Sequence, residues 1–191
     1  MLIEHAILGL LSLNPLSGYD IKKMFEGSVA LYWSGNNNQI YKTLIKLHEQ
    51  GWVSRETQIQ DASPTRKIYS ITEKGLEELR CWVSTNPEMP QVKNSFLIQL
   101  AWADLLTDSE LDNLLERYES EIRMQIAMLN LQKQQKNVSP SGISRDAYIN
   151  ILSARTPRET FFWNMILENW LSYYQAELNW VCKLRTESQQ Y

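Results

Sequence analysis

The chain has 191 residues, of which 43% are hydrophobic and 21% are charged, an ordinary composition for a globular protein. It contains no apolar run of about 18 residues and starts without a basic region, so we expect no transmembrane helix, no secretory signal and a cytoplasmic location. The formal net charge of −3 argues against a uniformly basic nucleic-acid binder, but residues 1–86 hold nine basic and nine acidic side chains and are neutral.

The first half of the chain begins with two short helical patterns. Apolar side chains at helical spacing predict a helix over residues 2–13, which Pro15 ends. Ser17 is placed to cap a second helix, and Asp20, three residues later, is placed to complete a capping box. Gly27 is expected to close this second helix.

A third helical pattern runs from an expected cap at Ser34 to a stop at Gly51, with an apolar inner face. Its outer face is rich in amides, which stabilise helices poorly but pair well with adenine in the major groove. A helix N-terminus also attracts phosphate. The alternative interpretation is a plain solvated face. The outer face presents Asn37, Asn38, Gln39, Tyr41 and Lys42 near its start, and Lys46 further along.

A small β-hairpin is predicted next. Residues 52–59 alternate apolar and polar side chains, residues 61–65 form a turn cluster, and residues 66–71 form the returning strand. Thr72 is then expected to cap a fourth helix. The hairpin tip is expected to carry Pro64, Arg66 and Lys67, where a wing contacts the minor groove or flanking phosphates.

This order of elements is the plan of a winged helix-turn-helix. Short motifs occur along it in the order Ile7-Leu8-Gly9-Leu10-Leu11, Leu16-Ser17-Gly18-Tyr19-Asp20-Ile21, Trp33-Ser34, Gln39-Ile40-Tyr41, Leu44, Leu47, Gly51, Arg66-Lys67-Ile68-Tyr69 and Thr72-Glu73-Lys74-Gly75. Through these motifs, residues 2–83 resemble the PadR family of bacterial transcriptional regulators. The resemblance implies a dimeric DNA-binding regulator, most often a repressor and less often an activator, that binds an inverted-repeat operator.

The chain departs from the family pattern at two places. Many members carry Gly-Arg-Pro at the wing tip, where this chain has residues 62–65, and many have a proline after the tyrosine of the third helix, where this chain has Lys42. We expect base-edge or adjacent phosphate contacts from Asn37, Asn38, Gln39 and Tyr41, backbone contacts from Lys42, Arg66 and Lys67, and assistance from Tyr19 and Lys22 of the second helix.

The second half, residues 87–191, is predicted to be a helical dimerisation and possible effector domain. It holds a short helix over residues 96–105, a long helix that starts at the capping box of Thr107 and Glu110, and a last helix with Pro157 in its first turn. It resembles the C-terminal domain of the longer, virulence-activator-like type of PadR protein. The long helix carries a coiled-coil-like seam of Leu111, Leu115, Tyr118, Ile122, Gln125, Leu129 and Gln132.

The last helix carries a broad stripe that a small domain cannot bury alone, so we expect a symmetric homodimer, with a monomeric three-helix bundle as the alternative. Its aromatic side chains are interpreted as core and dimer interface, or as a pocket for a small aromatic effector. The stripe consists of Phe162, Met165, Ile166, Asn169, Tyr173, Trp180, Val181 and Leu184, and the wider aromatic group adds Trp102, Phe161, Trp163, Trp170 and Tyr174.

The remaining chemistry-bearing residues predict no catalysis. The imidazoles of His5 and His48 show neither catalytic nor metal-ligand spacing, so no metal or cofactor is expected. Cys81 and Cys182 are expected to be buried thiols. The fold class is therefore mainly α with a small β-hairpin, in which an N-terminal winged helix-turn-helix over residues 1–86 precedes the helical domain. A winged helix used only for protein–protein assembly is the rival hypothesis.

Overall fold

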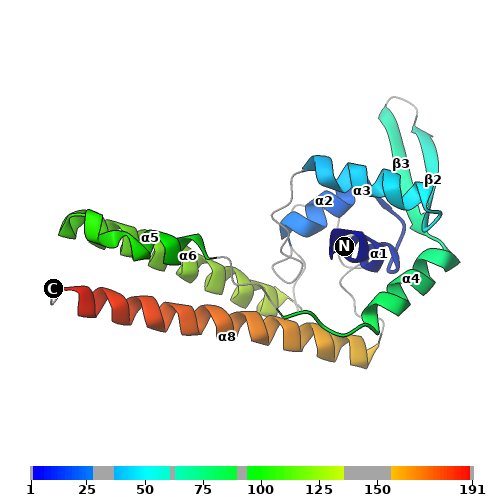
Figure 1. The fold of residues 1–191 in the computed structure, drawn as a ribbon. Coiled ribbons are helices and arrows are strands. Elements are labelled where there is room, and N and C mark those ends of the chain that lie inside the picture. Colours follow the sequence, from blue (N-terminus) through cyan, green and yellow to red (C-terminus); the bar gives the residue numbers. More distant parts are fainter. Residues whose placement is uncertain (1, 28–36, 61–62, 90–93, 136–155, 190–191) are drawn as a thin grey trace. The chain divides into compact units, whose positions relative to one another are not determined.

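The computed structural model describes residues 2–27, 37–60, 63–89, 94–135 and 156–189, which divide into two compact units (Figure 1). The described part of unit 1 ends at Glu88, and the described part of unit 2 begins at Met89. Each unit has its own hydrophobic core. No helix in the described ranges is long and apolar enough to cross a membrane.

The described part of unit 1 contains four helices: α1 (Leu2–Leu11), α2 (Gly18–Gly27), α3 (Asn37–Glu49) and α4 (Glu73–Val83). The first helix ends two residues before its predicted end. Its last turn tightens there, because the Leu13 amide bonds to the Leu10 carbonyl and the Ser12 hydroxyl donates to the Gly9 carbonyl. The predicted cap Ser34 lies outside the described residues. The fully buried core side chains include Ile7, Leu8, Ile21, Leu44 and Leu47.

A three-stranded antiparallel sheet completes unit 1, in the order β1-β3-β2. Its strands are β1 (Leu16–Ser17), β2 (Val53–Gln60) and β3 (Ser63–Ile71). The two-residue strand β1 is an addition to the predicted hairpin. Arg66 lies opposite Gln58, and Lys67 lies opposite Thr57. The prediction that these two cations occupy the hairpin tip is therefore wrong: β3 begins earlier than predicted, so they lie within its ladder.

One corner of unit 1 joins the end of α3 to the start of α4. Gly51 has a φ of 73°, a left-handed conformation that glycine adopts readily, and it turns the chain from α3 toward β2. The Thr72 hydroxyl donates to the Gly51 carbonyl over 2.7 Å, and its amide donates to the Trp52 carbonyl over 3.0 Å. The same hydroxyl accepts from the Gly75 amide, which confirms Thr72 as the cap of α4.

Unit 2 is built on two long helices, α6 (Asp108–Gln135) and α8 (Pro157–Ser188), preceded by α5 (Ser95–Ala101) and the short 3-10 helix η1 (Ala103–Leu105). Both predicted helix starts are confirmed. Thr107 and Glu110 exchange capping-box hydrogen bonds at the start of α6. Thr156 caps α8, with Pro157 in its first turn.

The predicted seam of α6 faces α8. Leu115, Ile122 and Leu129 are buried on it, and the core of unit 2 also takes in Phe96 of α5 and Val181 of α8. A hydrogen-bonded node ties all three helices together. In it the Tyr118 hydroxyl donates to Glu177 over 2.6 Å, and the Asn94 amide donates to both partners.

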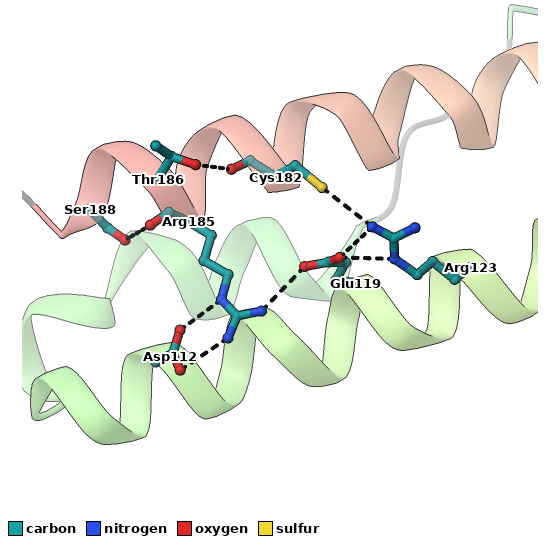
Figure 2. Close-up of polar contacts among 7 residues, drawn as sticks. All are labelled: Asp112, Glu119, Arg123, Cys182, Arg185, Thr186 and Ser188. Atoms are coloured by element: carbon teal, nitrogen blue, oxygen red, sulfur yellow. Dashed lines mark hydrogen bonds and ion pairs between the residues drawn. The ribbon is translucent and has the colours of Figure 1, made fainter.

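A charged cluster joins α6 and α8 along the same part of the helix pair as this node, as Figure 2 shows. Arg185 of α8 bonds to Asp112 over 2.7 Å and to Glu119 over 3.4 Å, and Glu119 also pairs with Arg123. Hydrogen bonds from Arg185, which outweigh an opposing effect of burial, hold the pKa of Asp112 below its ordinary value. The Cys182 thiol lies 4.0 Å from Arg123.

The cysteines differ from the sequence-based expectation. Cys81 is exposed and Cys182 is only partly buried. Cys81 lies on the outward side of α4, one residue before Trp82, which stacks on His5 with ring centroids 4.5 Å apart. The prediction of buried thiols is therefore wrong for Cys81, because the face of α4 that packs inward is the one that carries Trp82.

Candidate nucleic-acid interface

The helix α3 separates an apolar face from a polar face. Ile40, Leu44 and Leu47 are buried, as predicted, because they recur at the three- and four-residue spacing of one helix side. The opposite side of the helix is exposed. Its members include Asn38, Gln39, Tyr41 and Lys42, while Asn37 starts α3 and its side chain lies outside the described residues.

An apolar side chain that the sequence-based interpretation missed also lies on the exposed face of α3. Ile45 is 51% exposed, one turn after Tyr41 and Lys42. The signal was present in the sequence, since Ile45 stands seven residues after Asn38 and so shares its face. A branched apolar group among amides is suited to contact with a thymine methyl group in the major groove.

Tyr41 connects the exposed face of α3 to the start of α2. A Cβ built on Gly18 would lie 2.5 Å from Cε1 of the Tyr41 ring, so the ring lies directly against the glycine backbone. Any larger residue at position 18 would push the ring aside. The absence of a side chain at Gly18 therefore sets where Tyr41 points.

The start of α2 offers a second group of candidate contacts. Tyr19 is exposed, and the Lys23 ammonium group lies 4.8 Å from the centroid of its ring. Lys22 is half-buried on the same helix. The structure therefore brings Tyr19, Gly18 and Tyr41 together where α2 meets α3.

The predicted capping box of α2 is confirmed. The Ser17 amide donates to Oδ2 of Asp20 over 3.0 Å, and the Asp20 amide donates to the Ser17 hydroxyl over 3.2 Å. Burial of Asp20 would by itself raise the pKa of its carboxyl. Hydrogen bonds from Ser17 and the adjacent guanidinium of Arg66 outweigh that effect, so the pKa lies below its ordinary value.

The cations near this face have different surroundings. Arg66 donates from Nη2 to Oδ2 of Asp20 over 2.5 Å and to the Ser17 hydroxyl over 3.4 Å. Lys46 pairs with Glu4 of α1 over 2.6 Å. Lys42 and Lys67 are exposed, and in the described part of the chain neither takes part in an ion pair.

Several of the described aromatic side chains of unit 2 contact one another. Trp170, Tyr173 and Tyr174 contact one another along α8. An open groove of about 510 Å³ between α6 and α8 is lined by non-aromatic residues, namely Ile126, Asn130, Leu171, Ser172, Gln175, Ala176 and Asn179. Among the described residues no group of three His, Cys, Asp or Glu side chains could hold a metal ion.

Two family models match the chain. Residues 7–81 match the transcriptional regulator PadR-like family, and residues 92–187 match the virulence activator alpha C-term model. The two matches follow one another along the chain, one on the winged-helix segment and one on the helical segment.

Two curated relatives match shorter stretches. The negative transcriptional regulator PadR of Bacillus subtilis (strain 168) is 34% identical over 113 residues, which are 59% of this chain and 62% of that protein. A probable transcriptional regulator of Mycobacterium tuberculosis is 34% identical over 84 residues, which are 44% of each chain. The matched stretches thus span less than two thirds of either relative.

A solved structure of the Bacillus subtilis protein matches nearly the whole chain. Its complex with operator DNA has a TM-score of 0.75 at 25% identity, and the match covers 98% of this chain and 99% of that one. The same protein has also been solved with p-coumaric acid, and that structure matches with a TM-score of 0.70 at 24% identity over 98% of both chains. The second match shows a shared fold.

Proposed function

Because this chain belongs to the transcriptional regulator PadR-like family, in the form that carries a virulence activator alpha C-terminal domain, we propose that it is a dimeric, sequence-specific DNA-binding regulator. It acts as a repressor at an inverted-repeat operator. The observation that carries this proposal is the exposed face of α3, where amides, a tyrosine and a lysine surround Ile45. The Bacillus subtilis relative is named a negative regulator and has been solved on its operator.

The division of roles on this face follows from side-chain chemistry. Amides form paired hydrogen bonds with adenine, so Asn37, Asn38 and Gln39 read base edges, and Ile45 contacts a thymine methyl group. Lys42 and Lys67 neutralise phosphates, and Tyr19, Lys22 and Tyr41 contact the backbone or adjacent bases. A single cation that contacts phosphate adds affinity for any duplex, whereas a base contact adds affinity for one sequence.

Two copies are needed to read an inverted repeat, because the two recognition helices must lie about 34 Å apart or a multiple of that distance. Unit 2 supports a dimer. Phe162, Met165 and Tyr173, three of the apolar side chains predicted to form the stripe on α8, remain exposed in the single chain. Burying such a face against a second copy contributes about 25 cal/mol per Å² of apolar area.

A cytoplasmic location and a small aromatic effector complete the proposal. A regulator that binds genomic DNA acts in the cytoplasm of a bacterial cell. The effector is proposed because the Bacillus subtilis protein has been solved with p-coumaric acid. An effector would act by changing the distance between the two recognition helices, which is a coupling between two sites. No residue of unit 2 is assigned to it.

The test is fluorescence anisotropy with duplexes from the promoter of the protein's own gene and its neighbours, titrated across salt concentrations. Gln39→Ala should weaken binding to the preferred duplex by about 1–3 kcal/mol and leave unrelated DNA almost unaffected. Lys42→Ala should weaken both duplexes alike and reduce the salt slope by about one unit. If the intact protein binds no promoter duplex, the rival hypothesis of a protein-assembly module is favoured.

A further inference from the structure

We infer that Arg66 is a positioning residue: bound to Asp20, it fixes the part of the β2–β3 hairpin that extends beyond β1 to the first turn of α2 and does not itself neutralise a phosphate. This inference rests on the proposed function and concerns the same surface. It assigns the neighbouring cation, Lys67, to the phosphate and gives Arg66 a different task.

The sheet register explains why a cross-link is needed at this position. The short strand β1 pairs with β3 only at Leu16↔Tyr69 and Ser17↔Ile68, and the chain then continues into α2. From Lys67 toward the hairpin tip, β2 is the only sheet neighbour of β3 among the described residues. Two-stranded ribbons are marginally stable in water. Arg66 lies two residues beyond Ile68, which is the last residue of β3 that pairs with β1. The strand β1 therefore no longer supports the hairpin at Arg66.

The bonds around Asp20 favour retention of the ion pair. The carboxylate is fixed at the start of α2 by two hydrogen bonds from Ser17, and the Asp20 and Arg66 side chains are 26% and 44% exposed. A phosphate that recruited Arg66 would have to break a charge-assisted hydrogen bond and leave the carboxylate without its cation. It would leave that carboxylate beside the negatively charged DNA backbone.

Lys67 has no carboxylate partner that a phosphate would have to displace among the described residues. It is exposed, and no ion pair in the described residues involves it. The two cations are adjacent in sequence and on one strand, so they form a matched pair: one has a carboxylate partner and the other does not.

The Asp20→Asn variant separates the two roles, because they predict opposite signs. The amide oxygen can still accept from Ser17, so the capping box keeps an acceptor while the charge is lost. If Arg66 contacted a phosphate, releasing it would leave operator affinity unchanged or raise it. If Arg66 positions the hairpin, we expect affinity to fall about three- to fivefold.

The salt dependence of binding gives the second readout. Arg66→Gln should weaken operator binding while the slope of log affinity against log salt stays at its wild-type value. The matched control Lys67→Gln should lower that slope by about one unit. Arg66→Lys, which can still pair with Asp20, should restore most of the lost affinity.

A measurement without DNA separates failure of this inference from failure of the proposed function. Hydrogen exchange of the β3 amides in the free protein should accelerate about fivefold in Asp20→Asn and Arg66→Gln and stay unchanged in Lys67→Gln. If no duplex is bound by the wild type, the exchange result still decides whether Arg66 fixes the hairpin. Unchanged exchange, tighter or unchanged binding by Asp20→Asn, or a reduced slope in Arg66→Gln would each overturn the inference.

Discussion

Unit 1 and unit 2 bury their apolar side chains to different extents. In unit 1, the large aliphatic side chains of α1, α2 and α3 meet around one core, and Ile7, Leu8 and Leu44 have no exposed surface. In unit 2, Trp102 is 69% exposed and Leu105 is 82% exposed, and Phe162, Met165 and Tyr173 of α8 are exposed as well. Among the described residues, unit 1 therefore completes its core, whereas unit 2 leaves apolar surface exposed, which we propose a second copy covers.

The largest effect is expected from breaking the core of unit 1. Leu44→Ala removes a side chain with no exposed surface and should lower the free energy of unfolding by about 4 kcal/mol. Its neighbour Ile45 is the matched control, since Ile45→Ala should change stability by less than about 0.5 kcal/mol. Urea denaturation at several protein concentrations measures both. A midpoint for unit 1 that depends on concentration would show that its core is not self-contained.

The next largest effect concerns the exposed stripe of unit 2. Phe162→Glu together with Ile166→Glu places two charges in the proposed dimer contact, and we expect the dimer dissociation constant to rise about 100-fold, or about 2.7 kcal/mol. Sedimentation velocity measures the change. The control variant, Ser172→Glu with Thr186→Glu, alters two exposed polar positions of the same helix and should remain dimeric. Equal dissociation of both variants would contradict the assignment of the stripe.

The smallest effect is expected at the polar node of unit 2. Burial and the hydrogen bond to Glu177 raise the pKa of Tyr118 to about 12. Because this pKa lies above the unfolded value of about 10, the stabilisation is complete below pH 10 and is lost as pH rises toward 12. Tyr118→Phe should cost about 1 kcal/mol at pH 7. Thermal unfolding at pH 7 and across pH 9–12 tests this: a wild type and a variant with the same alkaline profile would disprove the role of the hydroxyl.

Local signals in the sequence predicted the helix starts well. The predicted caps at Ser17, Thr72 and Thr107 are confirmed because a cap depends on residues three positions apart. The family and the fold class were also predictable, since the winged-helix motifs are short and ordered. The apolar inner face of α3 followed from helical spacing alone.

The contacts between distant segments were not predictable in the same way. The strand β1 has only two residues, and its pairing with β3 gives no periodic signal. The bond between Asp20 and Arg66 joins residues 46 positions apart, so the sequence showed a cap and a cation but not their contact. The direct contacts of the candidate site residues with DNA stay a proposal, because their exposure allows contact with DNA and does not require it.

The corner at Gly51 has a mechanical consequence. Gly51 and Trp52, which follow α3, accept hydrogen bonds from Thr72, the cap of α4, and Lys74 donates one to the Gln50 carbonyl. These bonds tie the start of α4 to the segment between α3 and β2. A rotation of α4 would therefore move the proposed DNA-contacting face of α3 and the start of the β2–β3 hairpin together. The helix α3 and the hairpin would then move as one body, and DNA binding would depend on the orientation of that body.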